Sequence, residues 1–257
     1  MKDFTFMIYS QLLQALINVR YEFQTFEEFM QQPLKRVVIL RHDVDSWPIN
    51  ARQMAEIEHQ HKVKASYYFR KSVLSFNEKL LQQIIGLGHE IGYHYEDLAA
   101  CNGDRSAAMK RFERNLQFYR NYYPVKTIAM HGRPLSKWDS KDLWNEFSYR
   151  DYGLIGEPYL DLDFNKVMYL TDTGNCWDGD KFNVRDNVIS PFKFEIHSTY
   201  DLIDHIKRGV LPDRMMLNIH PARWNDNYMK WWIRYYVLTL PKLKVKQLIK
   251  QRRNRTI

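Results

Sequence analysis

Apolar segments that alternate with helix-forming segments limit the fold of this chain more than any other feature. Residues 37–40 form an unbroken Val-Val-Ile-Leu run, typical of a strand that is covered on both faces. Further strands are predicted at 65–69, 90–94, 127–131 and 215–219, with helices at 48–61, 74–87, 104–122 and 200–208. This alternation predicts an α/β protein with a mostly parallel sheet or barrel, outer helices, and a ligand site beyond the carboxyl ends of the strands.

The chain is predicted to form a single domain over residues 1–257. Its 257 residues are 45% hydrophobic, enough for a large core, and no Pro/Gly/Ser-rich linker, low-complexity run or internal repeat divides them. Helical spacing near residues 12–17, and a helix capped by Thr25, predict an N-terminal helical entry. The core is expected at about 36–221, followed by a basic C-terminal helix and tail at 225–257.

Charge and cysteine content say little about chemistry. The net charge of +8 comes largely from the last residues, which predict a solvated tail and leave weak contact with an anionic membrane surface as the alternative. No nucleic-acid-binding motif accompanies this charge, so no nucleic-acid partner is expected. Cys101 and Cys176 are far apart and are expected to be ordinary thiols. Without a signal-peptide pattern or a long apolar run, we expect cytoplasmic placement.

Two carboxylates follow the first predicted central strand. Side chains alternate along a strand, so Asp43 and Asp45 point the same way if the extended backbone continues. Two like charges in a small space raise one pKa unless a cation compensates, which favours a metal site or a base paired with a ligand. A structural role as a turn or cap is the common alternative for such a pair.

Three histidines end other predicted strands and are expected at the same mouth. His94 ends the strand at 90–94, His131 the strand at 127–131 and His220 the last strand. One carboxylate and two imidazoles are a common ligand set for Zn²⁺ and related divalent metals. One of the two carboxylates, together with His94 and His131, is therefore a predicted metal site, and His220 could act as a general acid.

Other histidines and the aromatic residues have less specific roles. His42 and His89 lie near strand ends but out of phase with their neighbours, which favours packing or supporting roles. Trp138, Trp177 and Trp224 are near the predicted mouth and are candidates for stacking on a sugar, although core packing is the commoner role of any single tryptophan.

In motif order, residues 36–221 resemble the polysaccharide deacetylases with the NodB homology domain, carbohydrate esterase family 4, especially bacterial members beginning Arg-His-Asp-Val-Asp. The segments that carry the resemblance are 41–45, 88–94, 131–134, 172–177 and 217–221. The resemblance implies a distorted (β/α) barrel of the NodB type. It also implies that Asp43 is the catalytic base and that Asp45 and His94 are metal ligands. Arg133 would orient Asp43, and Trp177 would pack near His220 or the acetyl methyl group.

One position departs from the family pattern. A second ligand histidine is expected four residues after His94, where this chain has Leu98, which cannot bind a metal. His131 completes the ligand set in our first hypothesis, and Glu96 or Asp97 in the second. In the third hypothesis the metal site has decayed. Glu96 and Trp138 are also predicted to contact substrate.

The predicted function is removal of an acetyl group from an N- or O-acetylated sugar of a polysaccharide or its precursor. The expected cofactor is a divalent metal, Zn²⁺ first, with Co²⁺, Ni²⁺ or Mn²⁺ as alternatives. The alternative function is a catalytically inactive deacetylase-like protein that binds glycan or a partner in envelope-polymer biosynthesis. The sequence does not indicate the sugar or the oligomeric state.

Overall fold

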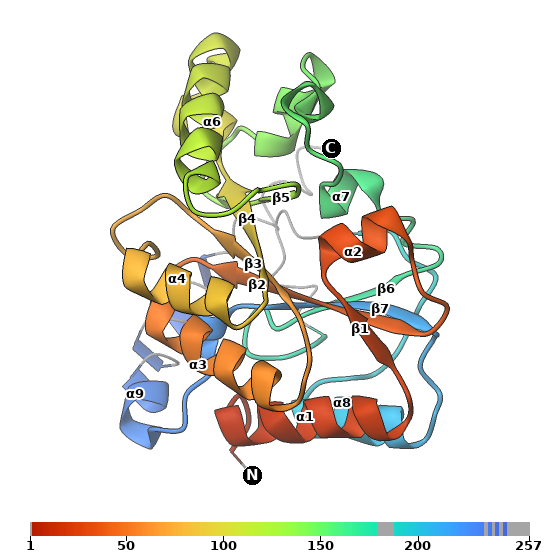
Figure 1. Cartoon of the computed structure of the whole chain (residues 1–257). Helices are drawn as coiled ribbons and strands as arrows, with labels where there is room; N and C mark the ends of the chain where they lie inside the picture. Colours follow the sequence, from red (N-terminus) through yellow and green to blue (C-terminus); the bar gives the residue numbers. More distant parts are fainter. Residues whose placement is uncertain (1, 179–187, 234–235, 238–239, 242–243, 246–257) are drawn as a thin grey trace.

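The computed structural model has a parallel sheet with helices packed around it (Figure 1). The structure describes residues 2–178, 188–233, 236–237, 240–241 and 244–245. Most of the predicted C-terminal basic tail therefore lies outside the described residues. Within the described residues, no helix is both long and apolar enough to cross a membrane.

The sheet confirms the predicted α/β class. Its strands run in the order β5-β4-β3-β2-β7-β6, all pairs are parallel, and β1 pairs with β2 off this path. The strands are β1 (Glu22–Gln24), β2 (Val37–Val44), β3 (Ser66–Phe69), β4 (Glu90–Tyr95), β5 (Ile128–Met130), β6 (Met168–Thr171) and β7 (Arg214–Ile219). Among the described residues β5 and β6 do not pair, so the distorted barrel is an open one.

The helices cover the sheet and its ends. They are α1 (Phe6–Asn18), α2 (Phe26–Gln31), α3 (Pro48–Gln60), α4 (Glu78–Gly86), α5 (Asp97–Ala100), α6 (Arg105–Arg120), α7 (Pro158–Asp161), α8 (Thr199–Lys207) and α9 (Tyr228–Ile233). Short 3₁₀ helices occur at Ser140–Asn145, Tyr149–Tyr152 and Pro221–Arg223. The N-terminal entry is confirmed, because α1 packs beside α8 below the sheet (Figure 1).

Most element predictions are confirmed, with three differences. β2 continues through the polar residues to Val44, and all eight of its residues are buried. α4 begins only at Glu78, because the Asn77 side chain caps it by accepting from the Leu80 amide. β6 was not predicted, although Val167 to Leu170 form a short apolar run, and its burial in the structure is mixed.

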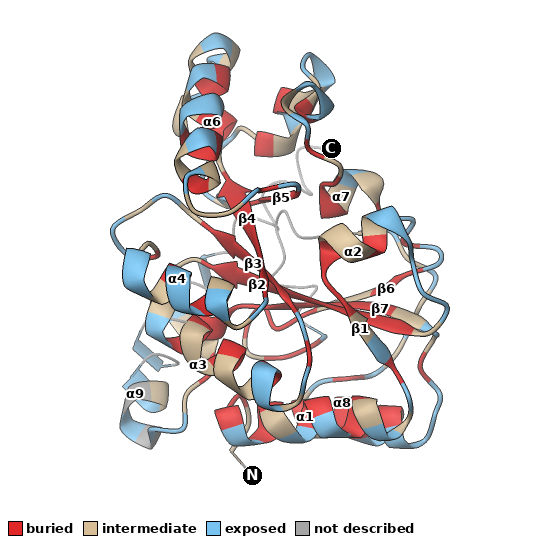
Figure 2. Ribbon diagram, viewed as in Figure 1, coloured by how far each residue is buried: buried red, intermediate tan, exposed pale blue. Residues whose placement is uncertain are grey.

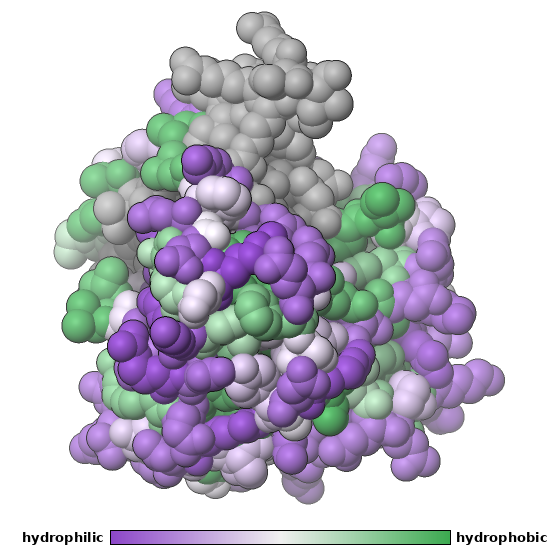
Figure 3. All heavy atoms as spheres, turned by 90° about the horizontal axis from the view of Figure 1, so that it is seen from above, coloured by the Kyte–Doolittle hydropathy of each residue, from purple (hydrophilic) through white to green (hydrophobic). Residues whose placement is uncertain are grey.

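The core lies between the sheet and its helices (Figure 2). β2, β3 and β4 are buried along their whole length, as the strands of a parallel sheet covered on both faces must be. Burying the polar residues at the end of β2 requires partners for each of them. On the face seen from above, apolar side chains form separate groups among hydrophilic ones (Figure 3).

Candidate metal and acid-base site

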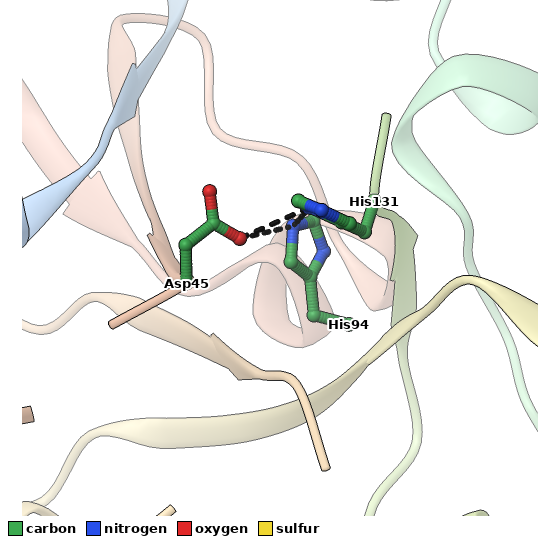
Figure 4. Close-up of side chains that lie close together, drawn as sticks. All are labelled: Asp45, His94 and His131. Carbon is green, nitrogen blue, oxygen red and sulfur yellow. Dashed lines mark hydrogen bonds and ion pairs between the residues drawn. The ribbon is translucent and has the colours of Figure 1, made fainter. Parts of the chain in front are cut away.

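Asp45, His94 and His131 converge at the carboxyl ends of three strands (Figure 4). Asp45 directly follows β2, His94 lies in β4, and His131 directly follows β5. One ligand atom from each lies within 4.8 Å of the other two. Asp45 Oδ1 is 3.0 Å from His131 Nδ1 and 3.6 Å from His94 Nε2, and the two imidazole nitrogens are 3.3 Å apart.

The donor atoms of this cluster fit a cation. His94 Nδ1 donates to the Ala129 carbonyl at 2.9 Å, which leaves Nε2 with its lone pair directed at the Asp43 and Asp45 carboxylates, 3.6 Å from each. Burial lowers the pKa of His94 to about 4, so the ring is neutral at pH 7. Asp45 Oδ1 is buried, and two imidazole nitrogens face it, His131 Nδ1 at 3.0 Å and His94 Nε2 at 3.6 Å. A bound cation, or a proton on His131 Nδ1, offsets the repulsion between lone pairs that face one another in this way.

Asp43 is held by Arg41 and Asn218. Arg41 Nε and an Arg41 terminal nitrogen donate to the two Asp43 oxygens at 2.9 and 2.8 Å, and Asn218 Nδ2 donates at 3.2 Å. Burial alone would raise the pKa of Asp43, but Arg41 and His94 hold it below its ordinary value. Asp43 is therefore a buried, oriented carboxylate that stays ionised.

His220 is fixed by Asp172, which directly follows β6. His220 Nδ1 lies 2.7 Å from Asp172 Oδ1, and the His220 amide donates to Asp172 Oδ2 at 2.9 Å. The Trp224 indole donates to the same carboxylate at 2.8 Å, and Arg223 pairs with it. His220 directly follows β7, which pairs with β2, and its positive charge lowers the pKa values of Asp43 and Asp45. With Nδ1 bound to Asp172, Nε2 is the atom that can exchange a proton.

The lowered pKa of Asp172 predicts that the free energy of unfolding depends measurably on pH. Burial raises its pKa, but Arg223 and His220 outweigh this and lower it to about 2. Because the ordinary value is about 4, the ionised group stabilises the fold above about pH 4, and this contribution is lost as the pH falls toward 2. In urea unfolding, the stability difference between wild type and Asp172→Asn is expected to shrink by roughly 2 kcal/mol between about pH 5 and 2.

The exposed Asp204 provides the control for this measurement. It pairs only loosely with Arg208, at 3.4 Å on the surface of α8, so Asp204→Asn is expected to track wild type at every pH. Parallel pH curves for Asp172→Asn and wild type would contradict the inferred ionisation of Asp172.

The second face of β2 carries a separate buried network. Glu58 of α3 lies 2.6 Å from His42 Nε2, accepts from Tyr67 at 2.6 Å and also accepts from Tyr9. His89 Nδ1 is 3.5 Å from the same carboxylate. These five side chains are buried, so the packing roles predicted for His42 and His89 are confirmed.

The two alternatives to His131 as third ligand, Asp97 and Glu96, lie outside the cluster and at its edge, respectively. Asp97 is buried against Tyr93, Arg111 and Asn115 and takes no part in the cluster. Glu96 accepts from Arg70 at 2.9 Å and is 3.8 Å from His131 Nε2, at the edge of the cluster. Leu98 is 1% exposed and belongs to the core.

Two other predicted site residues have different neighbours in the structure from those expected. Arg41, not Arg133, orients Asp43, because Arg133 follows β5 by three residues and reaches Glu96 instead, at 3.8 Å. Trp177 is 3% exposed and its indole donates to Thr199, so it has no face for a sugar. Trp224 is likewise fully buried, next to Phe4 and Trp177.

Trp138 is half-buried, and its ring lies against Gly103. A Cβ atom at Gly103 would come within 2.3 Å of the Trp138 ring, so glycine is required for this close contact. The role of Trp138 in substrate binding stays a prediction, as does that of Glu96.

Sequence reasoning missed four residues. Arg41 and Asn218 stand two positions before Asp43 and His220, and they are register partners on neighbouring strands. The strand period of two therefore puts them on the face of the site, a signal that was present in the sequence. Asp172 was noted only as part of a motif. Trp47, 39% exposed two residues after Asp45, has a left-handed φ of 56°, which is rare for a bulky side chain.

Comparisons with known proteins give structural likenesses only. No family model and no curated protein matches this chain. Among solved structures it is similar to a CE4 family pseudoenzyme from Bacillus anthracis, with 15% identity, 84% of this chain and 63% of that chain covered, and a TM-score of 0.44. It is also similar to a peptidoglycan deacetylase from Bacillus subtilis, with 12% identity, 87% and 95% covered, and a TM-score of 0.44. The chain spans less than two thirds of the pseudoenzyme's length.

Proposed function

We propose that this protein is a divalent-metal-dependent hydrolase that removes an acetyl group from an N- or O-acetylated sugar. The observation that carries the proposal is the convergence of Asp45, His94 and His131 beside Asp43, with His220 directly after β7, the strand that pairs with β2. Such a set combines metal ligands with two candidate acid-base groups. The resemblance of residues 36–221 to deacetylase motifs supports acetylated carbohydrate as the substrate class.

In this proposal Asp45, His94 and His131 would hold the metal, with Zn²⁺ the cation that best suits one carboxylate and two imidazoles. When bound, the metal would polarise the acetyl carbonyl and lower the pKa of a coordinated water. The Ala129 carbonyl would support metal binding, because it accepts from His94 Nδ1 and so fixes the orientation of the ring.

Asp43 takes the role of general base and His220 that of general acid. Asp43 accepts a proton from the attacking water, because Arg41 and Asn218 orient its carboxylate and its lowered pKa keeps it ionised. His220 donates a proton from Nε2 to the leaving amine or alcohol. Asp172 binds the opposite ring nitrogen and stabilises the imidazolium form.

The test of this function is acetate release by purified protein. Acetylated glycans and acetylated sugar nucleotides are incubated with protein stripped by a chelator and with protein reloaded with Zn²⁺. We expect release only from the reloaded protein, and loss of release in Asp43→Asn with the metal retained. Glycan binding without release, by wild type in every metal state, would support the inactive glycan-binding alternative instead.

Trp47 is the aromatic residue that we propose for sugar binding. It is exposed beside Asp45 and stands on a loop whose backbone donates to the Leu74 carbonyl at 3.1 Å, which steadies it. Replacing it by alanine is expected to raise KM about tenfold with kcat nearly unchanged, as loss of roughly 1.4 kcal/mol of uniform binding does.

Trp138→Ala is the comparison variant for Trp47→Ala. The Trp138 ring packs on Gly103, so we expect a lower melting temperature. Because Trp138 remains a predicted substrate contact, we expect its KM to rise less than that of Trp47→Ala. A raised KM in Trp138→Ala with none in Trp47→Ala would reverse these two assignments.

A further inference from the structure

A second group of metal-ligating side chains lies outside the site described above. Cys176, Asp178 and His197 each present one ligand atom, and these atoms lie within 4.8 Å of one another. His197 Nδ1 is 2.9 Å from Asp178 Oδ1. Nothing in the acid-base site uses these three side chains.

The backbone brings these residues together in two ways. Gly174 and Asn175 have left-handed φ values of 88° and 57°, and the Asn175 amide donates to the Asp172 carbonyl at 3.0 Å, which makes a tight turn before Cys176. The Trp177 amide then donates to the His197 carbonyl at 3.0 Å, which aligns this segment with the residues that enter α8. Cys176 and Asp178 flank that junction.

The donor set identifies the class of cation. A thiolate, an imidazole and a carboxylate together are typical ligands of Zn²⁺, whereas Mg²⁺ and Ca²⁺ prefer oxygen alone. His197 Nδ1 and Asp178 Oδ1 form a hydrogen bond at 2.9 Å, which a bound cation would replace by drawing both atoms to itself. A nucleophilic cysteine is a poorer explanation, because Cys176 is 3% exposed and its sulfur faces the Thr173 carbonyl at 3.6 Å.

We propose that Cys176, Asp178 and His197 form a second divalent-cation site of the Zn²⁺ class, with solvent at the fourth position. Binding ionises the Cys176 thiol and releases its proton to solvent. The site would join the turn at 172–175 to the start of α8. Since that turn begins with Asp172, the cation would also stiffen the carboxylate that holds His220.

Cobalt distinguishes this site from the first one. Co²⁺ replaces Zn²⁺ and gives a near-ultraviolet thiolate-to-metal absorption band only when a cysteine binds it, and the first site contains no sulfur. Titrated with Co²⁺ alone, the wild-type protein is expected to show this band and to bind two equivalents by equilibrium dialysis. Cys176→Ser is expected to lose the band and one equivalent, and Cys101→Ser to keep both.

Further variants keep the two proposals separable. His197 is exposed, so His197→Ala tests the site without disturbing the core. We expect this variant to bind the Co²⁺ that produces the band at least about tenfold more weakly. Asp45→Ala is expected to lose one equivalent and keep the band. Absence of the band at saturating Co²⁺, or its persistence in Cys176→Ser, overturns the second site and leaves the first untouched. A band with one equivalent that Asp45→Ala does not lower supports the second site and contradicts the first.

Discussion

His131→Ala is expected to lose one equivalent of divalent metal and to hydrolyse acetylated sugar at least about 10³-fold more slowly than wild type. His131 Nδ1 lies 3.0 Å from Asp45 Oδ1 and 3.3 Å from His94 Nε2, so its removal leaves two protein ligands. Electrostatic stabilisation by a catalytic metal is worth several kcal/mol, and each 1.4 kcal/mol is about tenfold in rate. Metal content by mass spectrometry and acetate release measure the two effects.

Glu96→Gln is the control that separates the hypotheses for the third ligand. Its carboxylate pairs with Arg70 at 2.9 Å, while His131 is nearer to Asp45 and His94. We expect Glu96→Gln to retain the metal and most of the activity. If this variant loses the metal and His131→Ala keeps it, Glu96 is the ligand.

Glu58→Ala is expected to lower the free energy of unfolding by about 3–5 kcal/mol, because it removes the acceptor that His42, Tyr9 and Tyr67 share in the core. The melting temperature should fall by roughly 10 °C for a chain of this size. Thermal unfolding followed by circular dichroism provides the measurement.

Glu56→Ala controls for the change in α3 itself. Glu56 lies two residues earlier on the same helix and pairs with Arg52 at the surface, so its loss should cost about 0.5 kcal/mol or less. Equal destabilisation by the two variants would mean that the network around His42 contributes no more than a surface ion pair.

The sequence by itself determined most of the strands, the sheet class and the edge at which the polar residues meet. The apolar run at 37–40 and its successors could be read directly, because parallel strands covered on both faces must be apolar. Because the carboxyl ends of parallel strands meet at one edge, the sequence also placed five polar residues there: Asp43, Asp45, His94, His131 and His220. The structure brings the first four together. His220 joins them through its effect on both carboxylates.

Only the tertiary structure decided the partners of each side chain. Whether Arg41 or Arg133 holds Asp43 depends on register, since Arg41 lies on the same face of β2 while Arg133 is displaced along a loop. Trp177 is buried because its indole donates to the buried Thr199 hydroxyl at the start of α8. Composition and spacing cannot decide such outcomes, because pairing and burial are set by segments distant in sequence. For the same reason, the Asp172 that fixes His220 became evident only once β6 and β7 lay side by side.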